Sequence, residues 1–167
     1  MAADERIIIV DEENREIGLA DRARMRSENL IHRATYILVF NDSGQLFVQK
    51  RTLTKDIYPG YFEIAAGGVV AAGEGYEESA RRELQEELGI AAKELTCHFD
   101  NFYDTPANRV WGRVYSCVHN GPMILQETEV ASGQFMAIRE VEEMMGRERF
   151  CPDGELILQR YLKKIMP

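Results

Sequence analysis

Three glutamates between residues 83 and 87 are the side chains of this sequence best placed to do chemistry together. Glu83, Glu86 and Glu87 are three and four residues apart, so a helix with about 100° per residue would turn them into one arc of roughly 100°. Three like charges on one arc repel one another unless a counter-charge lies between them. Magnesium prefers carboxylate and water oxygens and would supply that charge. The spacing therefore indicates a site for a divalent cation.

The segment that carries these glutamates has the composition of a helix. Residues 76–88 are rich in Glu, Arg, Leu and Ala, contain no Gly or Pro, and are followed by Gly89, a residue type that commonly ends helices. Ala80, Leu84 and Leu88 fall at i, i+4 and i+8, which predicts a buried stripe beside the carboxylate arc. The helix can then bury one side and present the carboxylates at its edge.

Small residues precede this helix. Residues 65–68 read Ala-Ala-Gly-Gly, and minimal side chains let the backbone approach a metal ion or a phosphate and offer a carbonyl ligand. Within the helix, Arg82 stands four residues before Glu86, a spacing at which opposite charges pair on a helix surface. The loop and the arginine both support the interpretation of the glutamates as a metal site.

The fixed positions over residues 68–90 form one pattern. They read Gly, five residues, Glu, seven residues, Arg-Glu-Leu, one residue, Glu-Glu, one residue, Gly-Ile. This pattern resembles the complete signature of the Nudix hydrolase family. The resemblance implies an α+β fold, with a mixed β-sheet between helices and residues 68–90 as a loop–helix–loop. It also implies a MutT-like diphosphatase that hydrolyses a diphosphate bond in a nucleoside diphosphate derivative or a related small molecule.

The same resemblance implies roles for individual residues. Glu74 and Arg82 would support the metal ligands without binding the metal themselves. The implied cofactor is Mg²⁺, with Mn²⁺ as a substitute. The implied metal ligands are Glu83, Glu86, Glu87 and the carbonyl of Gly68.

Hydrolysis also needs a base that takes a proton from the attacking water. Bound magnesium polarises a phosphoryl oxygen and lowers the pKa of water, and Glu83 and Glu87 are candidate bases within the helix. Members of the family also use a glutamate from a later loop. Glu127 and Glu129 both precede the strand predicted near residues 134–138. Of these two we favour Glu129.

Two basic residues are candidates for binding the substrate's phosphates. Arg51 offers a fork of donors and Lys55 a mobile point charge. The alternative for both is pairing with Asp or Glu at the surface. Aromatic residues at positions 102, 103 and 111 could stack on a base, but strand aromatics are more often part of the core.

Shorter segments extend the resemblance over most of the chain. They are similar to the bacterial YfcD-like group of Nudix proteins, a resemblance that names no substrate. The segments are HRATY at residues 32–36, QKRT at 49–52, KD at 55–56, AGGVV at 66–70, RVWG at 109–112 and SCV at 116–118.

Two other functions are alternatives to hydrolysis. The chain also resembles isopentenyl-diphosphate isomerase around residues 32–34, which include His32, around residues 50–52 and Lys55, and in the helix. That family needs a catalytic cysteine and a metal-binding histidine where residues 65–68 have neither. A non-catalytic module that senses a nucleotide is the other alternative. Such modules generally lose the glutamates of the signature, and this chain keeps them all. Hydrolysis is therefore the predicted function.

Length and charge limit the class of partner. The 167 residues fit one domain, residues 1–167, with residues 1–30 as an N-terminal extension. The net charge is −8 and no basic run interrupts it, whereas binding of a nucleic-acid polymer usually needs a basic face. A small anionic substrate remains compatible, because metal ions supply positive charge. We therefore expect a small-molecule diphosphate rather than a nucleic acid.

The sequence also predicts where the protein works. Its longest apolar runs, such as residues 7–10 and 37–40, are far shorter than the about 20 residues that cross a bilayer. The N-terminus lacks the basic-then-apolar layout of a secretory signal. Three cysteines form no CxxC spacing, which favours reduced thiols over disulfides or a thiolate zinc site. These features predict a cytoplasmic protein with no membrane contact.

The elements that must position the site follow from apolar periodicity and turn residues. A hairpin is predicted from residues 6–10 and 16–20, and its edge could pair with a second copy, which leaves a homodimer open. Strands dominate, so the pattern predicts an α+β fold. The other expected strands are 35–40, 46–51, 62–65, 95–103, 110–119 and 134–138, and the expected helices are 21–28, 76–88, 140–145 and 155–165.

Overall fold

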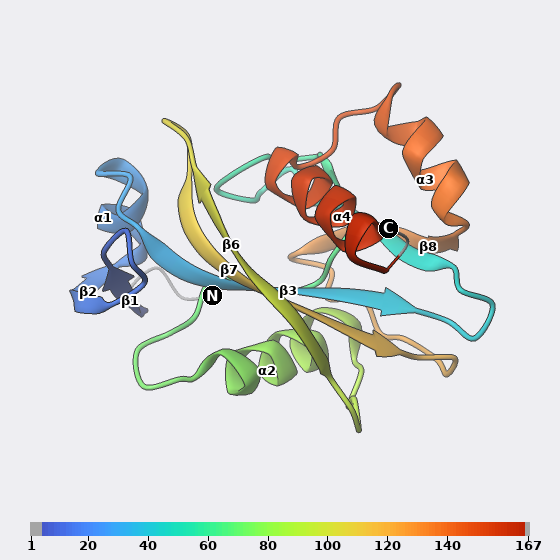
Figure 1. Cartoon of the computed structure of the whole chain (residues 1–167), viewed down its shortest axis with the longest axis horizontal. Coiled ribbons are helices and arrows are strands. Elements are labelled where there is room, and N and C mark those ends of the chain that lie inside the picture. Colours follow the sequence, from blue (N-terminus) through green and yellow to red (C-terminus); the bar gives the residue numbers. More distant parts are fainter. Residues whose placement is uncertain (1–4, 166–167) are drawn as a thin grey trace.

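A mixed eight-stranded β-sheet forms the centre of the computed structural model, which describes residues 5–165 (Figure 1). Residues 1–4, at the start of the predicted N-terminal extension, and residues 166–167 lie outside the described part. The strands are β1 (Arg6–Val10), β2 (Glu16–Asp21), β3 (His32–Phe40), β4 (Leu46–Arg51), β5 (Phe62–Glu63), β6 (Thr96–Asp104), β7 (Arg109–Val118) and β8 (Val130–Met136). The helices are α1 (Arg22–Ser27), α2 (Tyr76–Leu88), α3 (Ile138–Met145) and α4 (Pro152–Ile165).

β3 pairs with three other strands of the sheet. It runs parallel to β7 along residues 32–40, and it pairs antiparallel with β1 at His32 and with β4 at Phe40. β6 extends the sheet beyond β7, whereas β5 and β8 both pair antiparallel with β4. Parallel neighbours cannot be joined by a tight turn, and the chain between β3 and β7 forms β4, β5, α2 and β6.

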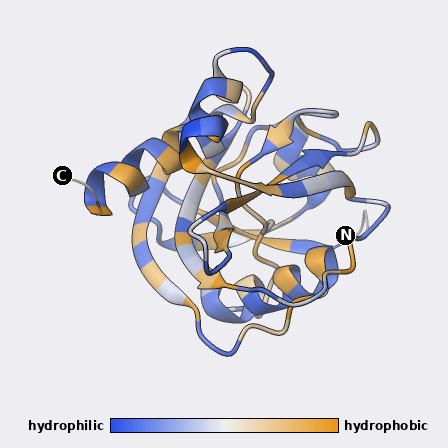
Figure 2. Cartoon of the chain, turned by 90° about the vertical axis from the view of Figure 1, so that its right-hand side faces the viewer, coloured by the Kyte–Doolittle hydropathy of each residue, from blue (hydrophilic) through white to orange (hydrophobic). Residues whose placement is uncertain are grey.

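Helices cover both faces of the sheet. α2 lies on one face, and α3 and α4 lie on the other (Figure 1). Hydrophobic and hydrophilic residues alternate along the strands and helices (Figure 2), as expected of elements that bury only one side. This arrangement confirms the predicted α+β fold of a mixed sheet between helices.

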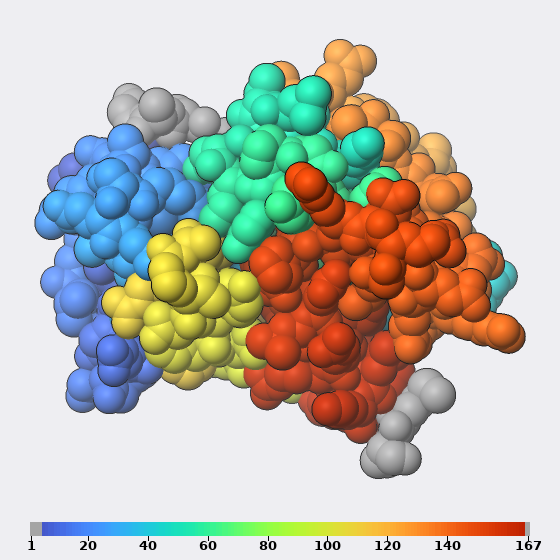
Figure 3. Space-filling model, turned by 90° about the horizontal axis from the view of Figure 1, so that it is seen from above, coloured from blue at the N-terminus to red at the C-terminus, as the bar shows by residue number. Residues whose placement is uncertain are grey.

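The N-terminal hairpin and α1 attach to the chain's own sheet. β1 and β2 pair antiparallel over residues 6–21, and the Val10 amide donates to the Ile31 carbonyl at 2.9 Å. Figure 3 shows this blue segment against the yellow end of β6 and β7 and the blue-green segment that follows β4. The hairpin therefore places α1 beside two loops from the centre of the chain.

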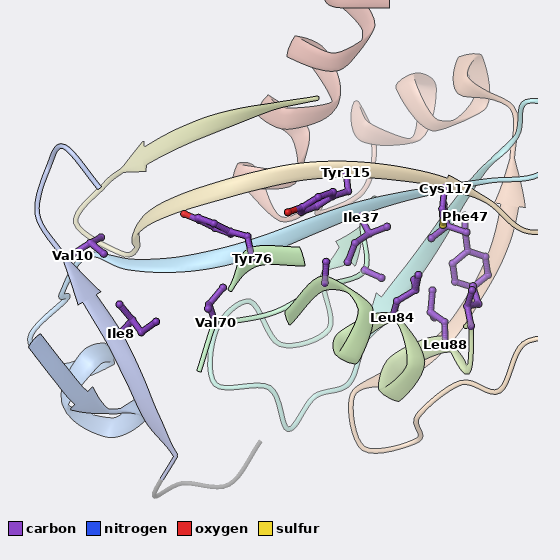
Figure 4. Close-up of a cluster of buried hydrophobic side chains, with 14 of the residues drawn as sticks. Ile8, Val10, Ile37, Phe47, Val70, Tyr76, Leu84, Leu88, Tyr115 and Cys117 are labelled. Carbon is purple, nitrogen blue, oxygen red and sulfur yellow. The ribbon is translucent and has the colours of Figure 1, made fainter. Parts of the chain in front are cut away.

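The buried stripe predicted for α2 is confirmed. Ala80, Leu84 and Leu88 are all fully buried, and they pack in one cluster with Ile37 of β3 and Tyr115 of β7 (Figure 4). The helix ends where it was expected to, because Gly89 adopts a left-handed φ of 66° and its amide donates to the Gln85 carbonyl. This packing fixes the rotation of α2 and so decides where its glutamates point.

Several predicted boundaries are wrong by a few residues. β3 begins at His32 rather than at residue 35, because pairing with β7 starts there. The strand predicted at 134–138 is β8, which covers 130–136, because Ala137 caps α3 and Ile138 already belongs to that helix. α4 begins at Pro152, since a proline in the first helical turn needs no acceptor for an amide proton.

Over residues 5–165, no helix has both the length and the apolar composition to cross a bilayer.

Candidate active site

One pocket brings together the residues that the sequence singled out. Its walls come from α1, β3, β4, β5 and the segments on either side of it, α2, β7 and the turn before it, the loop before β8, and the start of α4. Glu127, the other candidate base, is exposed and does not line it. The predicted metal-binding, base and phosphate-binding residues that line it are Arg51, Lys55, Gly68, Glu83, Glu86, Glu87 and Glu129.

The three glutamates of α2 differ in burial. Glu83 and Glu87 are only 4% and 5% exposed, whereas 47% of the Glu86 side chain is exposed. Glu83 and Glu87 sit deep because they flank the buried stripe, and the small-residue loop makes room for them. A Cβ on Gly68 would lie 2.8 Å from the Glu83 carboxylate. The Gly67 amide donates to Glu87 at 3.3 Å.

Burial makes the two inner carboxylates reluctant to ionise. It raises the pKa of Glu87 to about 8, and the charge of Glu83 adds to this shift, while Lys55 and the Gly67 amide oppose it. Burial also raises the pKa of Glu83, against the pull of Arg82. Two adjacent carboxylates that are short of positive charge form a donor set that suits a hard divalent cation.

The acidic side chains of the pocket do not surround one common point. Among residues 5–165, no group of three or more Asp, Glu, His or Cys side chains is arranged around one point. Glu86 instead pairs with Arg82, and Glu129 with Lys55. The Gly68 carbonyl accepts hydrogen bonds from the Thr35 amide at 2.9 Å and from the Thr35 hydroxyl at 3.4 Å.

Arg82 connects Glu74 with two of the glutamates of α2. Its guanidinium donates to both oxygens of Glu74 at 2.6 and 2.9 Å, and it also contacts Glu83 at 3.1 Å and Glu86 at 3.0 Å. Burial would raise the pKa of Glu74, but hydrogen bonds from Arg82 and the Ala71 amide outweigh it and lower the pKa. The predicted pairing of Arg82 with Glu86 is confirmed.

Lys55 and Glu129 meet at the side of the pocket formed by the loop before β8. Their side chains form an ion pair. The Thr52 amide and hydroxyl bond the carbonyls of Glu129 and Thr128, which ties the segment after β4 to this loop. Lys55 therefore lines the pocket, where a phosphate-binding residue is expected to lie. It also pairs with an acidic side chain, which was the alternative to phosphate binding.

Arg51 lies deeper in the same pocket. It donates to the Glu63 carboxylate at 3.4 Å and to the Ile57 carbonyl at 3.0 Å, and its side chain is 14% exposed. Glu63 is the neighbour across the strand pair from Gln49 on β4. The sequence prediction missed Glu63 as part of the pocket. An acidic residue within the apolar run of residues 61–66 was the available signal.

A second buried carboxylate was also missed. Asp153 at the start of α4 lines the pocket and accepts a hydrogen bond from the Tyr36 hydroxyl at 2.6 Å. One oxygen each of Glu63, Asp153 and Gln49 is buried without a hydrogen-bond partner among the described residues. The pocket floor is therefore rich in acceptors.

Replacement of Glu63 by Gln tests this burial through the pH dependence of stability. Burial and the charge of Asp153 raise the pKa of Glu63 to about 7. The native carboxyl then keeps its proton to a higher pH than the unfolded one, so the free energy of unfolding falls as pH rises from about 4.5 to 7. Urea unfolding without divalent metal should show Glu63→Gln gaining about 2 kcal/mol over the wild type between pH 4.5 and 8. The control Glu13→Gln is at an exposed position. A difference that does not change with pH would contradict the assignment.

Gly67 is required by the close approach of the loop to β3. It has a φ of +135°, and a Cβ there would lie 2.0 Å from the Thr35 carbonyl oxygen. Gly67→Ala is therefore expected to lower the free energy of unfolding by at least about 2 kcal/mol. Gly73→Ala is the matched control, since Gly73 also has a positive φ but no atom within 4 Å of its Cβ position. Equal losses for the two variants in urea unfolding would show that the contact with Thr35 is unimportant.

The aromatic candidates for base stacking belong to the core. Phe102 and Trp111 stack on each other, with centroids 4.9 Å apart and planes at 8°. They pack against the cluster under α2, and Tyr103 packs against the cluster on the other face. None of the three lines the pocket.

Known proteins resemble this chain in sequence and fold. The NUDIX domain model matches residues 30–157. A Nudix hydrolase of Pseudomonas aeruginosa is 46% identical over 158 residues, covering 95% of this chain and 94% of the relative. The Nudix hydrolase YfcD of Escherichia coli is 43% identical over 164 residues, covering 98% and 90%. The structure of DR0079 from Deinococcus radiodurans matches with a TM-score of 0.77 at 24% identity, covering 93% of this chain and 98% of that one.

These comparisons confirm the family expected from residues 68–90, including the likeness to YfcD. Members of this family are hydrolases that generally cleave the pyrophosphate bond of nucleoside diphosphate derivatives, with small molecules as substrates. The fold, the pocket and the sequence relatives agree, and the chain belongs to the Nudix hydrolase family.

Proposed function

We propose that this chain hydrolyses the diphosphate bond of a nucleoside diphosphate derivative or a related small molecule in a reaction that depends on Mg²⁺. The observation that carries the proposal is the pair of inner glutamates. Glu83 and Glu87 are buried side by side against a loop of small residues, and burial raises the pKa of both. A pair of this kind gains stability when a divalent cation binds.

The proposed metal ligands are Glu83, Glu86 and Glu87, with the Gly68 carbonyl in support. When bound, the metal would polarise a phosphoryl oxygen and lower the pKa of the attacking water. Arg82 keeps Glu83 and Glu86 together through contacts of 3.1 and 3.0 Å. Glu74 in turn fixes Arg82 by accepting two hydrogen bonds.

Glu129 is the proposed base. It lines the pocket with the α2 glutamates, and its partner Lys55 orients the carboxylate. A carboxylate oxygen of Glu129 takes the proton of the attacking water. Lys55 and Arg51 are then placed to contact the substrate's phosphate oxygens, Lys55 as a point charge and Arg51 as a fork.

The experiment is a panel of diphosphates incubated with Mg²⁺, or with Mn²⁺ in its place, and read by phosphate release after phosphatase treatment. The panel covers nucleotide sugars, dinucleotides, coenzyme A and non-nucleotide diphosphates. We expect turnover of at least one member, and loss of turnover when a chelator removes the metal. Nucleotide binding without turnover of any member would instead favour a binding module. Conversion of isopentenyl diphosphate to its dimethylallyl isomer without phosphate release would favour an isomerase.

A further inference from the structure

The floor of the pocket gathers buried oxygen atoms that no protein group satisfies. Gln49 of β4, Glu63 of β5 and Asp153 at the start of α4 form this floor. They are only 5%, 8% and 7% exposed. In the part of the chain that the structure describes, one oxygen of each side chain is buried without a hydrogen-bond partner. Buried acceptors are normally hydrogen-bonded, because an unpaired one lowers the stability of the fold. Three of them at one floor are an exception to that rule.

The three side chains are neighbours in space. Gln49 and Glu63 are opposite each other in the β4–β5 pair. The unpartnered oxygen of Glu63 lies against α4, 2.8 Å from the position that a Cβ on Gly154 would take. Burial and then the charge of Asp153 raise the pKa of Glu63. The three acceptors therefore belong to one surface, formed where β4, β5 and α4 meet.

The remaining polar atoms of these side chains are already bound. The Tyr36 hydroxyl donates to Oδ2 of Asp153 at 2.6 Å. Arg51 donates to Oε2 of Glu63 at 3.4 Å. The amide nitrogen of Gln49 donates to a backbone carbonyl at 3.4 Å. These contacts decide which atoms stay available, namely Oδ1 of Asp153 and the Oε1 atoms of Glu63 and Gln49.

A neutral group with N–H or O–H donors suits this floor better than a cation does. Arg51 pairs with Glu63, and its Nε is also buried without a partner. A cation at the floor would meet this guanidinium, whereas a neutral polar group can donate to the oxygens and accept from Nε. Within residues 5–165, no group of three or more Asp, Glu, His or Cys side chains is placed to hold a metal ion.

Arg51 also connects the floor with the glutamates of α2. Burial would lower its pKa, but the negative charges around it, those of Glu63, Glu87 and Asp153 among them, outweigh this effect and raise the pKa. Arg51 is therefore close enough to both regions to feel their charges. A diphosphate bound beside Glu87 and Arg51 would leave an adjoining part of the substrate within reach of the floor.

We propose that Gln49, Glu63 and Asp153 form a specificity subsite that accepts hydrogen bonds from a neutral donor group of the substrate, outside its diphosphate. The donor is an amino group of the base or a hydroxyl group of the sugar. A site built to bond such a group rejects an analogue that lacks it, because its own buried acceptors are then left unpaired. The inference rests on the proposed function and narrows its substrates to diphosphates that can donate at this floor.

The test compares substrates that differ by one donor group. ADP-glucose and GDP-glucose each carry an amino group that IDP-glucose lacks, and CDP-glucose carries one that UDP-glucose lacks. UDP-glucose carries a sugar hydroxyl that its deoxy analogue lacks. For at least one pair, kcat/KM of the member with the donor should be higher about tenfold or more. A preference among the bases assigns the amino group, and a preference between the sugars assigns the hydroxyl.

The variant Asp153→Asn should reduce this preference about tenfold or more. The Tyr36 hydroxyl still needs an acceptor, so the amide oxygen stays with Tyr36 and the amide nitrogen replaces the available oxygen. A donor of the protein then faces the donor of the substrate. Glu63→Gln should act in the same way, because Arg51 retains the amide oxygen. The assays are run at pH 8, since burial raises the pKa of Glu63 to about 7 and its carboxyl must be ionised to accept.

Glu155→Gln is the matched control. Glu155 lies on α4 two residues after Asp153 and does not line the pocket, so its replacement should leave the preference unchanged. Both rates of a pair are measured on the same sample, and a smaller folded fraction therefore cancels from their ratio. If the floor only supports the fold, Asp153→Asn and Glu63→Gln lower both rates equally and the ratio stays constant, which would overturn the proposal. Equal rates for the two members of every pair in the wild type would overturn it too.

Failure of the proposed hydrolysis can be told apart from failure of the subsite. If no compound is turned over, calorimetry with the same pairs and Mg²⁺ measures binding alone. Tighter binding of a member with the donor, lost in Asp153→Asn and kept in Glu155→Gln, would support the subsite without hydrolysis. Equal binding of both members of every pair to the wild type would overturn it.

Discussion

Glu87→Gln is expected to lower kcat/KM for diphosphate hydrolysis by at least about 10³-fold, equivalent to about 4 kcal/mol of transition-state stabilisation. Glutamine keeps the size of the side chain but removes the negative charge that would face the metal. Glu87 is 5% exposed and lies beside Glu83, so no water-exposed carboxylate can easily take its place. The measurement is the Mg²⁺ dependence of initial rates with the best substrate of the panel.

The loss should come from the metal site and not from unfolding. Replacing a buried, poorly compensated carboxylate by a neutral amide removes a desolvation cost, so Glu87→Gln should unfold at no lower urea concentration than the wild type in the absence of metal. Glu78→Gln, on the exposed side of the same helix, is the control and should keep full activity. A stricter form is the double variant Glu86→Gln, Glu87→Gln. Activity within tenfold of the wild type would rule out these residues as metal ligands.

The α2 half of the site could be predicted because a helix converts spacing directly into direction. Gly89 and the stripe of Ala80, Leu84 and Leu88 fixed both the end of the helix and its rotation, so the glutamates between them had to share an edge. The spacing alone did not predict how deeply each glutamate is buried. Glu83 and Glu87 are buried while Glu86 is not, and this difference depends on how closely the loop at Gly68 packs on the helix.

The other half of the pocket depends on contacts between distant parts of the chain. Tyr36 and Asp153 are 117 residues apart, and Arg26 and Asn108 are 82 residues apart. No periodicity links such positions, because they meet only when β3, β7 and α4 have assembled. Arg22 and Arg26 could be placed on one face of a helix from the sequence, but not on a face that reaches the pocket.

Glu129→Gln is expected to lower kcat by about 10²- to 10⁴-fold, the usual contribution of a general base. Glu127→Gln provides the matched control two residues away, because Glu127 is exposed and does not line the pocket. It should keep kcat within about twofold of the wild type, as most surface substitutions do. Equal losses in the two variants would argue against Glu129 as the base.

Loss of the ion pair with Lys55 is another way in which Glu129→Gln could act. Lys55→Gln breaks the same pair but leaves the carboxylate in place, so it should mainly raise KM through weaker phosphate binding. The split between kcat and KM separates the two roles. If Glu129 is the base, Glu129→Gln lowers kcat far more than Lys55→Gln does. Equal changes of kcat and of KM in the two variants would assign Glu129 a positioning role and leave Glu83 or Glu87 as the base.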